Sequence, residues 1–238
     1  MSHAKNVVSY SRLVDICTGY GGTYNPGRPT LQLKAMRALL KEAQSSLQLV
    51  KQTVSDYNNA TNDREITFEE IQMMATSVVR MLKSTGVSAQ TMDDANHLLR
   101  LIKGRRATPR PAIPSEEAEA TIRNRSYTHQ SYVSIADNFA RLVQMVTKQP
   151  QYLPNEEELK VPALEALVNK AEAMMDKVSL ARVAWTKART KRNAMLYKAE
   201  TAVYGTAMAV KQYVGAVYGL QSDEYKQLSR LSFTKYVS

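Results

Sequence analysis

Cysteine, glycine and proline are scarce in this chain of 238 residues. The single cysteine, Cys17, excludes an intrachain disulfide and any metal site built from several thiolates. Nine glycines and eight prolines are too few for a turn-rich β-sandwich or β-barrel. No stretch approaches 18 uncharged apolar residues; the nearest, 199–220, contains Glu200 and Lys211. We therefore expect no membrane-spanning helix and regard a membrane partner as unfavoured.

The overall composition is that of a folded domain. Hydrophobic residues make up 44% and charged residues 23% of the chain, close to the averages for soluble globular proteins. This excludes wholesale disorder and collagen-like repeats. The first residues lack the apolar core of a secretory signal peptide. We expect a soluble cytoplasmic protein with room for one large domain or two small ones.

Positive charge is in excess, with 32 Lys and Arg against 22 Asp and Glu, for a formal net charge of +10. Such an excess favours polyanionic partners, either nucleic acid or an anionic membrane surface. Many soluble helical proteins are equally basic, so the charge alone does not select a function.

The second half of the chain repeats the first at a displacement of about 128–130 positions. Helices share some Ala and Leu positions by chance, but an ordered series of different residue types indicates a tandem duplication. We predict two copies, over residues 5–102 and 126–233, which are too few for a solenoid. Matched pairs include Arg12 and Arg141, Tyr24 and Tyr152, Pro26 and Pro154, Ala43 and Ala171, and Arg64 and Arg192.

The segment between the copies, residues 103–125, contains Arg105 and Arg106 and then Pro109, Pro111 and Pro114. Prolines at this density cannot continue a helix, so we predict an extended, solvated linker. The alternative is a basic arm that contacts phosphate groups.

Both copies carry the apolar periodicity of long helices. Apolar residues recur in alternating steps of three and four, which is the coiled-coil period, and neither 31–85 nor 163–204 contains Gly or Pro. Two interpretations stay open: 31–85 and 163–219 are single long helices, or each is a hairpin that turns near Asn58 and its counterpart. The unbroken period favours single helices. A short helix is expected to close each copy after Ser88 and Ser222.

These patterns predict an all-α fold. We expect an elongated helical bundle of two tandem copies, with long coiled-coil-like helices paired antiparallel about a pseudo-two-fold axis. The helix midpoints would carry Tyr57 and Trp185, and Arg64 and Arg192 would lie in the seam. Arginines at seam positions cost stability but set the register of the helices.

Patterns for catalysis or metal binding are incomplete. The segment 22–29 has the glycine spacing of a phosphate-binding loop but lacks its lysine and a preceding strand. Asp94 and His97 share a helix face, but their counterparts, Glu224 and Gln227, lose the histidine that a paired metal site needs. We expect no enzyme activity, no catalytic residue, no metal and no cofactor, and we identify no small-molecule substrate.

Residues 177–198 contain seven basic side chains and no acidic one. A basic helix with aromatic residues along it, here Trp185 and Tyr197, can follow a phosphate backbone. The alternative is a solvated face opposite an acidic neighbour. The candidate polyanion-binding residues are Arg105, Arg106, Arg182, Lys187, Arg189, Lys191 and Lys198.

Tyrosine outnumbers phenylalanine by 13 to three. Tyr204, Tyr213 and Tyr218 lie in a segment that is also rich in Gly and Ala, which permit close approach between helices. We interpret these three tyrosines as a packing or oligomer interface.

Residues 211–219 and 223–233, together with the Tyr24-Asn25-Pro26-Gly27 loop, resemble a family of uncharacterised, tandem-duplicated helical proteins of the Bacteroidota. The resemblance covers the whole chain. It implies the duplication and a bacterial origin, and it implies no activity.

The leading functional expectation is a structural or interaction protein that self-assembles as a homo-oligomer through its helix faces. The alternative is a sequence-nonspecific nucleic-acid-binding protein that uses the basic segments 177–198 and 100–110. A membrane-active helical protein is the third.

Overall fold

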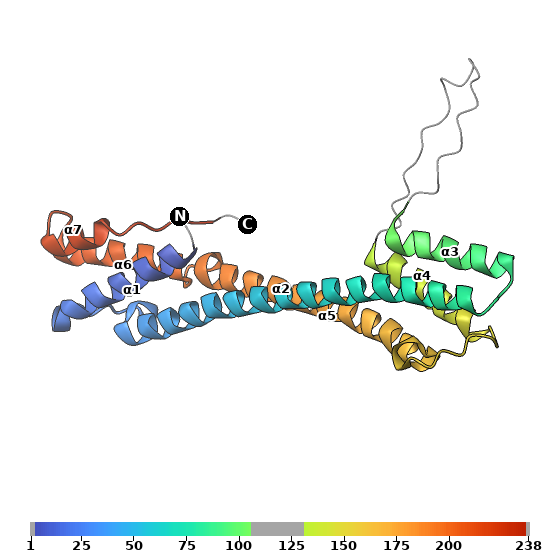
Figure 1. Ribbon diagram of the computed structural model, residues 1–238. Coiled ribbons are helices and arrows are strands. Elements are labelled where there is room, and N and C mark those ends of the chain that lie inside the picture. The colour runs from blue at the N-terminus through green and yellow to red at the C-terminus, as the bar shows by residue number, and fades with distance from the viewer. Residues whose placement is uncertain (1–2, 106–130, 237–238) are drawn as a thin grey trace, which may run out of the picture. The chain divides into compact units, whose positions relative to one another are not determined.

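The computed structural model describes residues 3–105 and 131–236 of the chain. Every regular element in these residues is a helix, as expected for an all-α fold (Figure 1). Most of the predicted linker, Arg106 included, lies outside the described residues.

The main helices, in chain order, are α1 (His3–Gly19), α2 (Leu33–Ser84), α3 (Ala89–Lys103), α4 (Tyr132–Thr147), α5 (Val161–Asn193), α6 (Val203–Tyr218) and α7 (Asp223–Ser229). Four short helical turns lie between them: η1 (Gly21–Thr23), η2 (Pro29–Leu31), η3 (Glu157–Leu159) and the π-helical η4 (Ala194–Lys198).

The chain forms two compact units, and each unit takes segments from both halves of the sequence. Unit 1 consists of residues 1–58 and 180–238, and unit 2 consists of residues 59–179. The boundaries between the units fall inside α2 and α5. The predicted copies over 5–102 and 126–233 follow the sequence repeat, which is a different division and stays a prediction.

Unit 1 has its own hydrophobic core, where the buried face of α1 meets α6. Tyr10, Leu13 and Cys17 of α1 are fully buried, and so are Val210 and Val214 of α6. In α1, burial recurs every three or four residues because those positions share one face of the helix.

Unit 2 has a second core, between the C-terminal part of α2, the N-terminal part of α5, and α3 and α4, which lie beside each other (Figure 1). Ile71, Val78 and Leu82 of α2 are fully buried, as are Phe139 and Leu142 of α4. The long helices therefore contribute different segments to two separate cores.

The structure decides between the single-helix and hairpin interpretations differently in the two halves. Residues 33–84 form one uninterrupted α-helix of 52 residues, so the single-helix prediction is confirmed there and no turn forms at Asn58. In the second half the prediction of one helix over 163–219 is wrong. There α5 ends at Asn193, the π-helical turn follows, and Ala199 and Ala202 are extended before α6 begins.

The backbone that follows η4 passes very close to Gly205 of α6. A β-carbon at this position would lie 2.2 Å from the carbonyl oxygen of Glu200. The chain that leaves η4 therefore packs directly on the backbone of α6, in space that any larger residue would need. The sequence shows neither Gly nor Pro inside 163–204, which is why the break could not be seen there.

The short closing helices begin where the sequence places them. The side-chain oxygens of Ser88 and Ser222 accept hydrogen bonds from the backbone N–H groups of Thr91 and Tyr225. Both serines are N-caps, a position that favours Ser because its hydroxyl satisfies an otherwise unpaired N–H group.

Candidate anion-binding groove

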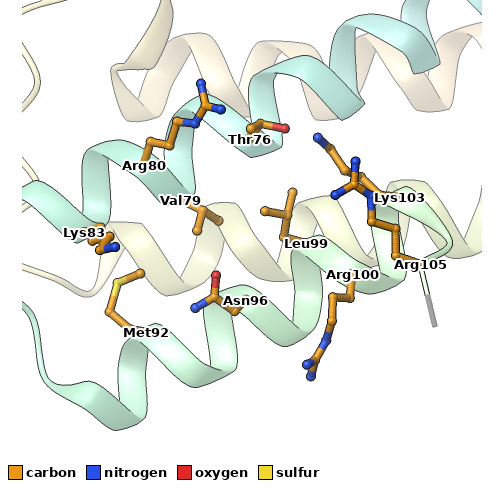
Figure 2. Close-up of a pocket in the computed structure, with 10 residues that line it drawn as sticks. All are labelled: Thr76, Val79, Arg80, Lys83, Met92, Asn96, Leu99, Arg100, Lys103 and Arg105. Carbon is orange, nitrogen blue, oxygen red and sulfur yellow. The ribbon is translucent and has the colours of Figure 1, made fainter. Parts of the chain in front are cut away.

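A groove of about 560 Å³ lies in unit 2 between the C-terminal end of α2 and α3. Of the ten described residues that line it, five are basic and none is acidic. Figure 2 shows these side chains on the two helices, with Lys103 and Arg105 extending toward Thr76. The lining residues are Thr76, Val79, Arg80, Lys83, Met92, Asn96, Leu99, Arg100, Lys103 and Arg105.

Arg105 reaches the groove because of the way α3 ends. Gly104 adopts a left-handed conformation with a φ of 63°, and its N–H group donates to the carbonyl of Leu101. The N–H group of Arg105 donates to the carbonyl of Arg100 at 3.0 Å. This pair of bonds is a Schellman motif, which needs a residue that tolerates positive φ. The chain therefore turns back sharply enough for Arg105 to line the groove.

The five cations of the groove form no ion pair among the described residues. Only Arg100 has a polar side-chain partner there, the ring of His97 at 3.4 Å. By contrast, Asp63 and Glu70 of α2 pair with Lys177 and Lys170 of α5, at 2.8 and 2.7 Å. These two acidic residues are thus paired with α5, while the cations of the groove have no ion-pair partner among the described residues.

A second hollow of about 580 Å³ continues from the groove along α2. It shares Thr76, Arg80 and Lys103 with the groove and adds one carboxylate, Glu69, and the exposed side chain of Met73. The basic surface of unit 2 is therefore a trough with Arg80 and Lys103 common to both of its parts.

The predicted polyanion-binding residues lie in two places. Arg105 lines the groove of unit 2, and Arg106 lies outside the described residues. The others are exposed in unit 1, on α5 and η4; Arg189 lies 5.3 Å from the centre of the Trp185 ring. These exposed residues are Arg182, Lys187, Arg189, Lys191 and Lys198.

The residues predicted to set the helix register make specific contacts. The rings of Tyr57 and Trp185 stack in unit 1, with centroids 5.4 Å apart. Arg64, in unit 2, covers the ring of Tyr132.

Arg192 donates two hydrogen bonds to the side-chain oxygen of Asn193, at 2.7 and 3.1 Å. Burial and the neighbouring Arg189 lower the pKa of Arg192. For Arg192, as for Arg64, Tyr57 and Trp185, a role in the helix register stays a prediction.

The three tyrosines predicted as an interface are half-buried on α6. Tyr213 packs edge-on against Tyr24, and Tyr218 packs against Tyr20 and donates to the hydroxyl of Thr23 at 2.8 Å. Tyr204 lies beside the core of unit 1. All three thus pack within unit 1, and an oligomer role for them stays a prediction.

Sequence reasoning missed Arg80 and Lys83 as partners of the basic segment 100–110. Their spacing of three puts both on one face of α2, and that spacing was visible in the sequence. The missing information was which part of α3 packs beside that face. Only the tertiary structure supplies it, because the two sets of residues are about 20 positions apart in the chain.

In the described part of the chain no group of three or more His, Cys, Asp or Glu residues is arranged to hold a metal ion. Among the same residues, no helix combines the length and the apolar character that crossing a membrane requires. Comparisons of the chain with models of protein families, with curated proteins and with solved structures found no match.

Proposed function

We propose that the protein binds phosphate-rich polyanions, and nucleic-acid backbones in particular, without reading their sequence. The observation that carries this proposal is the groove between α2 and α3, with five basic side chains and no acidic one among its described lining residues. Cations without ion-pair partners are available to phosphate oxygens, and their binding releases the counterions condensed on the polymer.

The side chains of the groove are suited to contacts with the phosphate backbone of a nucleic acid more than with its bases. Lysine and arginine side chains supply charge and N–H donors to phosphate, while Val79, Met92 and Leu99 supply the apolar part of the lining. The trough that continues past Arg80 allows more than one phosphate to bind in a row. The exposed cations of α5 form a separate basic surface in unit 1.

The test is the binding of labelled oligonucleotides of unrelated sequence, in single- and double-stranded form, across a salt series. We expect the affinity to fall by orders of magnitude between about 50 mM and about 200 mM salt and to be independent of sequence. The variant Arg80→Gln/Lys103→Gln/Arg105→Gln should weaken binding and lower the slope of log affinity against log salt by about 2–3.

A matched control separates the groove from the general charge of the protein. Lys34→Gln/Arg37→Gln/Lys51→Gln removes the same charge from exposed positions of unit 1 and should leave most of the affinity and slope. A third variant, Arg182→Gln/Lys187→Gln/Lys191→Gln, tests the α5 surface. If the groove variant and the control lose the same amount of binding, the groove is not the site.

Self-assembly is the second candidate function, and two exposed apolar side chains favour it. Ile66 and Met73 of α2 are 64% and 66% exposed in unit 2. They are seven residues apart and therefore share one helix face, as in the contact stripe of a coiled coil. Exposed apolar side chains on one face are a feature of protein interfaces.

Light scattering with size-exclusion chromatography tests this candidate. Assembly through α2 predicts a mass well above the 26.7 kDa of one chain, which persists in high salt. Ile66→Ser/Met73→Ser should return the protein to a single chain. A wild-type protein that elutes as one chain at all concentrations would exclude assembly as the function.

We also propose that the two halves of the chain descend from a tandem duplication, and the local structure supports this. The hydroxyl of Tyr24 donates to the carbonyl of Leu31 at 2.8 Å. In the same way, the hydroxyl of Tyr152 donates to the carbonyl of Leu159 at 2.9 Å. The buried positions of α1 and α4 also correspond at a displacement of 129. They are Val7 and Ala136, Tyr10 and Phe139, Leu13 and Leu142, Val14 and Val143, and Cys17 and Val146.

The same correspondence accounts for the broken helix of the second half. Leu196 lies 128 positions after Phe68, whereas Val203 lies 132 positions after Ile71, and all four are buried. Four residues inserted between them explain both the change in displacement and the break between η4 and α6. On this proposal Gly205 corresponds to Met73, so the inserted residues cover in unit 1 a face that unit 2 leaves exposed.

The antiparallel pairing of α2 with α5 belongs to the same proposal. In unit 2, Asp63 pairs with Lys177 and Glu70 pairs with Lys170, so the partner's number falls as the residue number rises. This order is the one that antiparallel neighbours require. These ion pairs are exposed and each contributes only about 0–1 kcal/mol, so they support the direction of pairing more than its strength.

A further inference from the structure

The C-terminal segment of the chain, residues 230–236, lies on unit 1 outside any helix after α7 ends at Ser229. We refer to this segment as the tail. Its Leu231, Phe233 and Tyr236 side chains pack against the core of unit 1. The surface that holds it, here called the tail site, consists of His3 and Asn6 of α1, Tyr197 of η4 and Lys211 of α6.

Asn6 is the centre of the tail site. Its side-chain N–H group donates to the carbonyl of Thr234 at 2.7 Å, and its oxygen accepts from the N–H group of Thr234 at 3.1 Å. A side-chain amide that bonds both groups of one residue recognises an extended backbone and not a particular side chain. With the tail in place Asn6 is only 1% exposed, so both of these hydrogen bonds are shielded from water.

Further contacts fix the direction and position of the tail. Lys211 donates to the carbonyl of Leu231 at 2.5 Å, and its ammonium group lies 5.6 Å from the centre of the Phe233 ring. At the other end, the Tyr236 ring packs against His3 and Tyr197, with centroids 4.6 and 5.4 Å away. The site therefore combines backbone recognition with two places for aromatic side chains.

Tyr197 reaches the tail because η4 is π-helical. Its hydroxyl contacts Nδ1 of His3 at 2.8 Å and accepts from the side-chain amide of Asn6 at 3.1 Å. A π-turn adds a residue to the helical repeat and rotates the side chains that follow it, and such turns often occur at functional sites. In this chain the turn builds one wall of the tail site.

We propose that the tail site accepts the tail of a second copy of the chain in place of its own. The seated tail shows that the site fits this segment, and every contact it makes is available to an identical segment from another molecule. Residues 231–236 belong to no helix, so the tail can leave the site without unfolding one. This proposal is independent of polyanion binding by unit 2.

Covalent attachment favours the chain's own tail. A tethered segment competes at an effective concentration of about millimolar, so the wild-type protein keeps its own tail bound at micromolar concentrations. Exchange between copies becomes visible when this competition is removed. Two full-length variants do so in complementary ways.

The first variant, Asn6→Ala, loses the site but keeps an intact tail. The second, Thr234→Pro/Tyr236→Ala, keeps the site but lacks the N–H group and the ring that hold its own tail. Each variant alone should elute as a single chain of 26.7 kDa. An equimolar mixture at about 100 µM should contain a species of twice that mass, because one molecule supplies the tail and the other the site.

A labelled peptide with the sequence of residues 229–236 provides the second measurement. It should bind the Thr234→Pro/Tyr236→Ala variant at least tenfold more tightly than the wild type, and Asn6→Ala should not bind it. Lys235→Gln, which changes an exposed tail residue, is the control and should behave as the wild type. A mixture of folded variants that stays at the mass of one chain, or equal binding of the peptide to all variants, would overturn the proposal.

Discussion

The guanidinium carbon of Arg64 lies 3.9 Å from the centre of the Tyr132 ring. Phe68 packs edge-on with the same tyrosine, at 4.8 Å between ring centroids. The Nε of Arg64 is buried and has no hydrogen-bond partner among the described residues. A cation on an aromatic face thus joins the middle of α2 to the start of α4 within unit 2.

We expect Arg64→Ala to lower the free energy of unfolding by about 1 kcal/mol through loss of this cation–π contact and its packing. Arg64→Leu retains apolar packing and removes the unpaired Nε, so its loss should be smaller. A double-mutant cycle with Tyr132→Leu measures the coupling by chemical denaturation. A coupling energy near zero would show that the contact does not stabilise unit 2.

Gly205→Ala should destabilise unit 1 by about 1–3 kcal/mol, although alanine is normally the better helix former. The added β-carbon would overlap the carbonyl oxygen of Glu200, and a backbone group cannot move aside as a side chain can. Gly215→Ala is the matched control, since its β-carbon would meet the flexible side chains of Leu220 and Tyr225 at 3.0 and 3.1 Å. Thermal unfolding measures the loss of stability in both variants. Equal losses in Gly205→Ala and Gly215→Ala would contradict the close backbone packing at Gly205.

Cys17 should be inert to alkylation in the folded protein. Burial raises the pKa of its thiol from 9.0 to about 12, so at mildly alkaline pH the folded chain holds about a thousandfold less thiolate than a solvated cysteine. We expect iodoacetamide to react at about pH 8 only through transient unfolding, and the rate to rise steeply near the denaturation midpoint. Rapid modification of the native protein would contradict the position of Cys17 in the core of unit 1.

The stability of unit 1 should fall as the pH decreases below about 6.5. Burial and the nearby Arg192 and Arg189 lower the pKa of His3 from 6.5. The unfolded chain therefore takes up the proton at a higher pH than the folded chain, and acid favours unfolding. Above pH 6.5 both states are neutral at His3, and its contribution is fully present.

The variant His3→Gln tests this, because glutamine still offers hydrogen bonds to Tyr197 but does not titrate. Between about pH 7.5 and about pH 5 its melting temperature should fall less than that of the wild type. The other two histidines are common to both proteins and cancel in the comparison. Identical pH dependence of the two proteins would show that His3 is not linked to folding.

Local sequence patterns were sufficient for much of the helical structure. The alternating three- and four-residue apolar period favoured one helix over 31–85, and the structure forms it over 33–84; Ser88 and Ser222 marked the starts of α3 and α7. These features depend on residues close together in the chain, because helix hydrogen bonds and caps span only a few positions.

The break after Asn193 could not be predicted in the same way. The residues from Ala194 to Ala202 are individually compatible with a helix, and no Gly or Pro marks the end of α5. The backbone leaves the helix there because the core of unit 1 buries Leu196 and Val203 on either side of the break. Tertiary packing, and not helix propensity, determines that geometry.

The candidate anion-binding groove was also predictable from the sequence only in part. Composition and the basic residues of 100–110 pointed to a polyanion, because net charge is a property of the sequence alone. The packing of α2 and α3 in unit 2 decided which cations lie together, because it brings Arg80 and Lys83 beside Lys103 and Arg105.

Only the tertiary structure shows that each compact unit contains segments from both halves of the chain. Residues that complete one core are more than 100 positions apart, and only the folded chain brings them together.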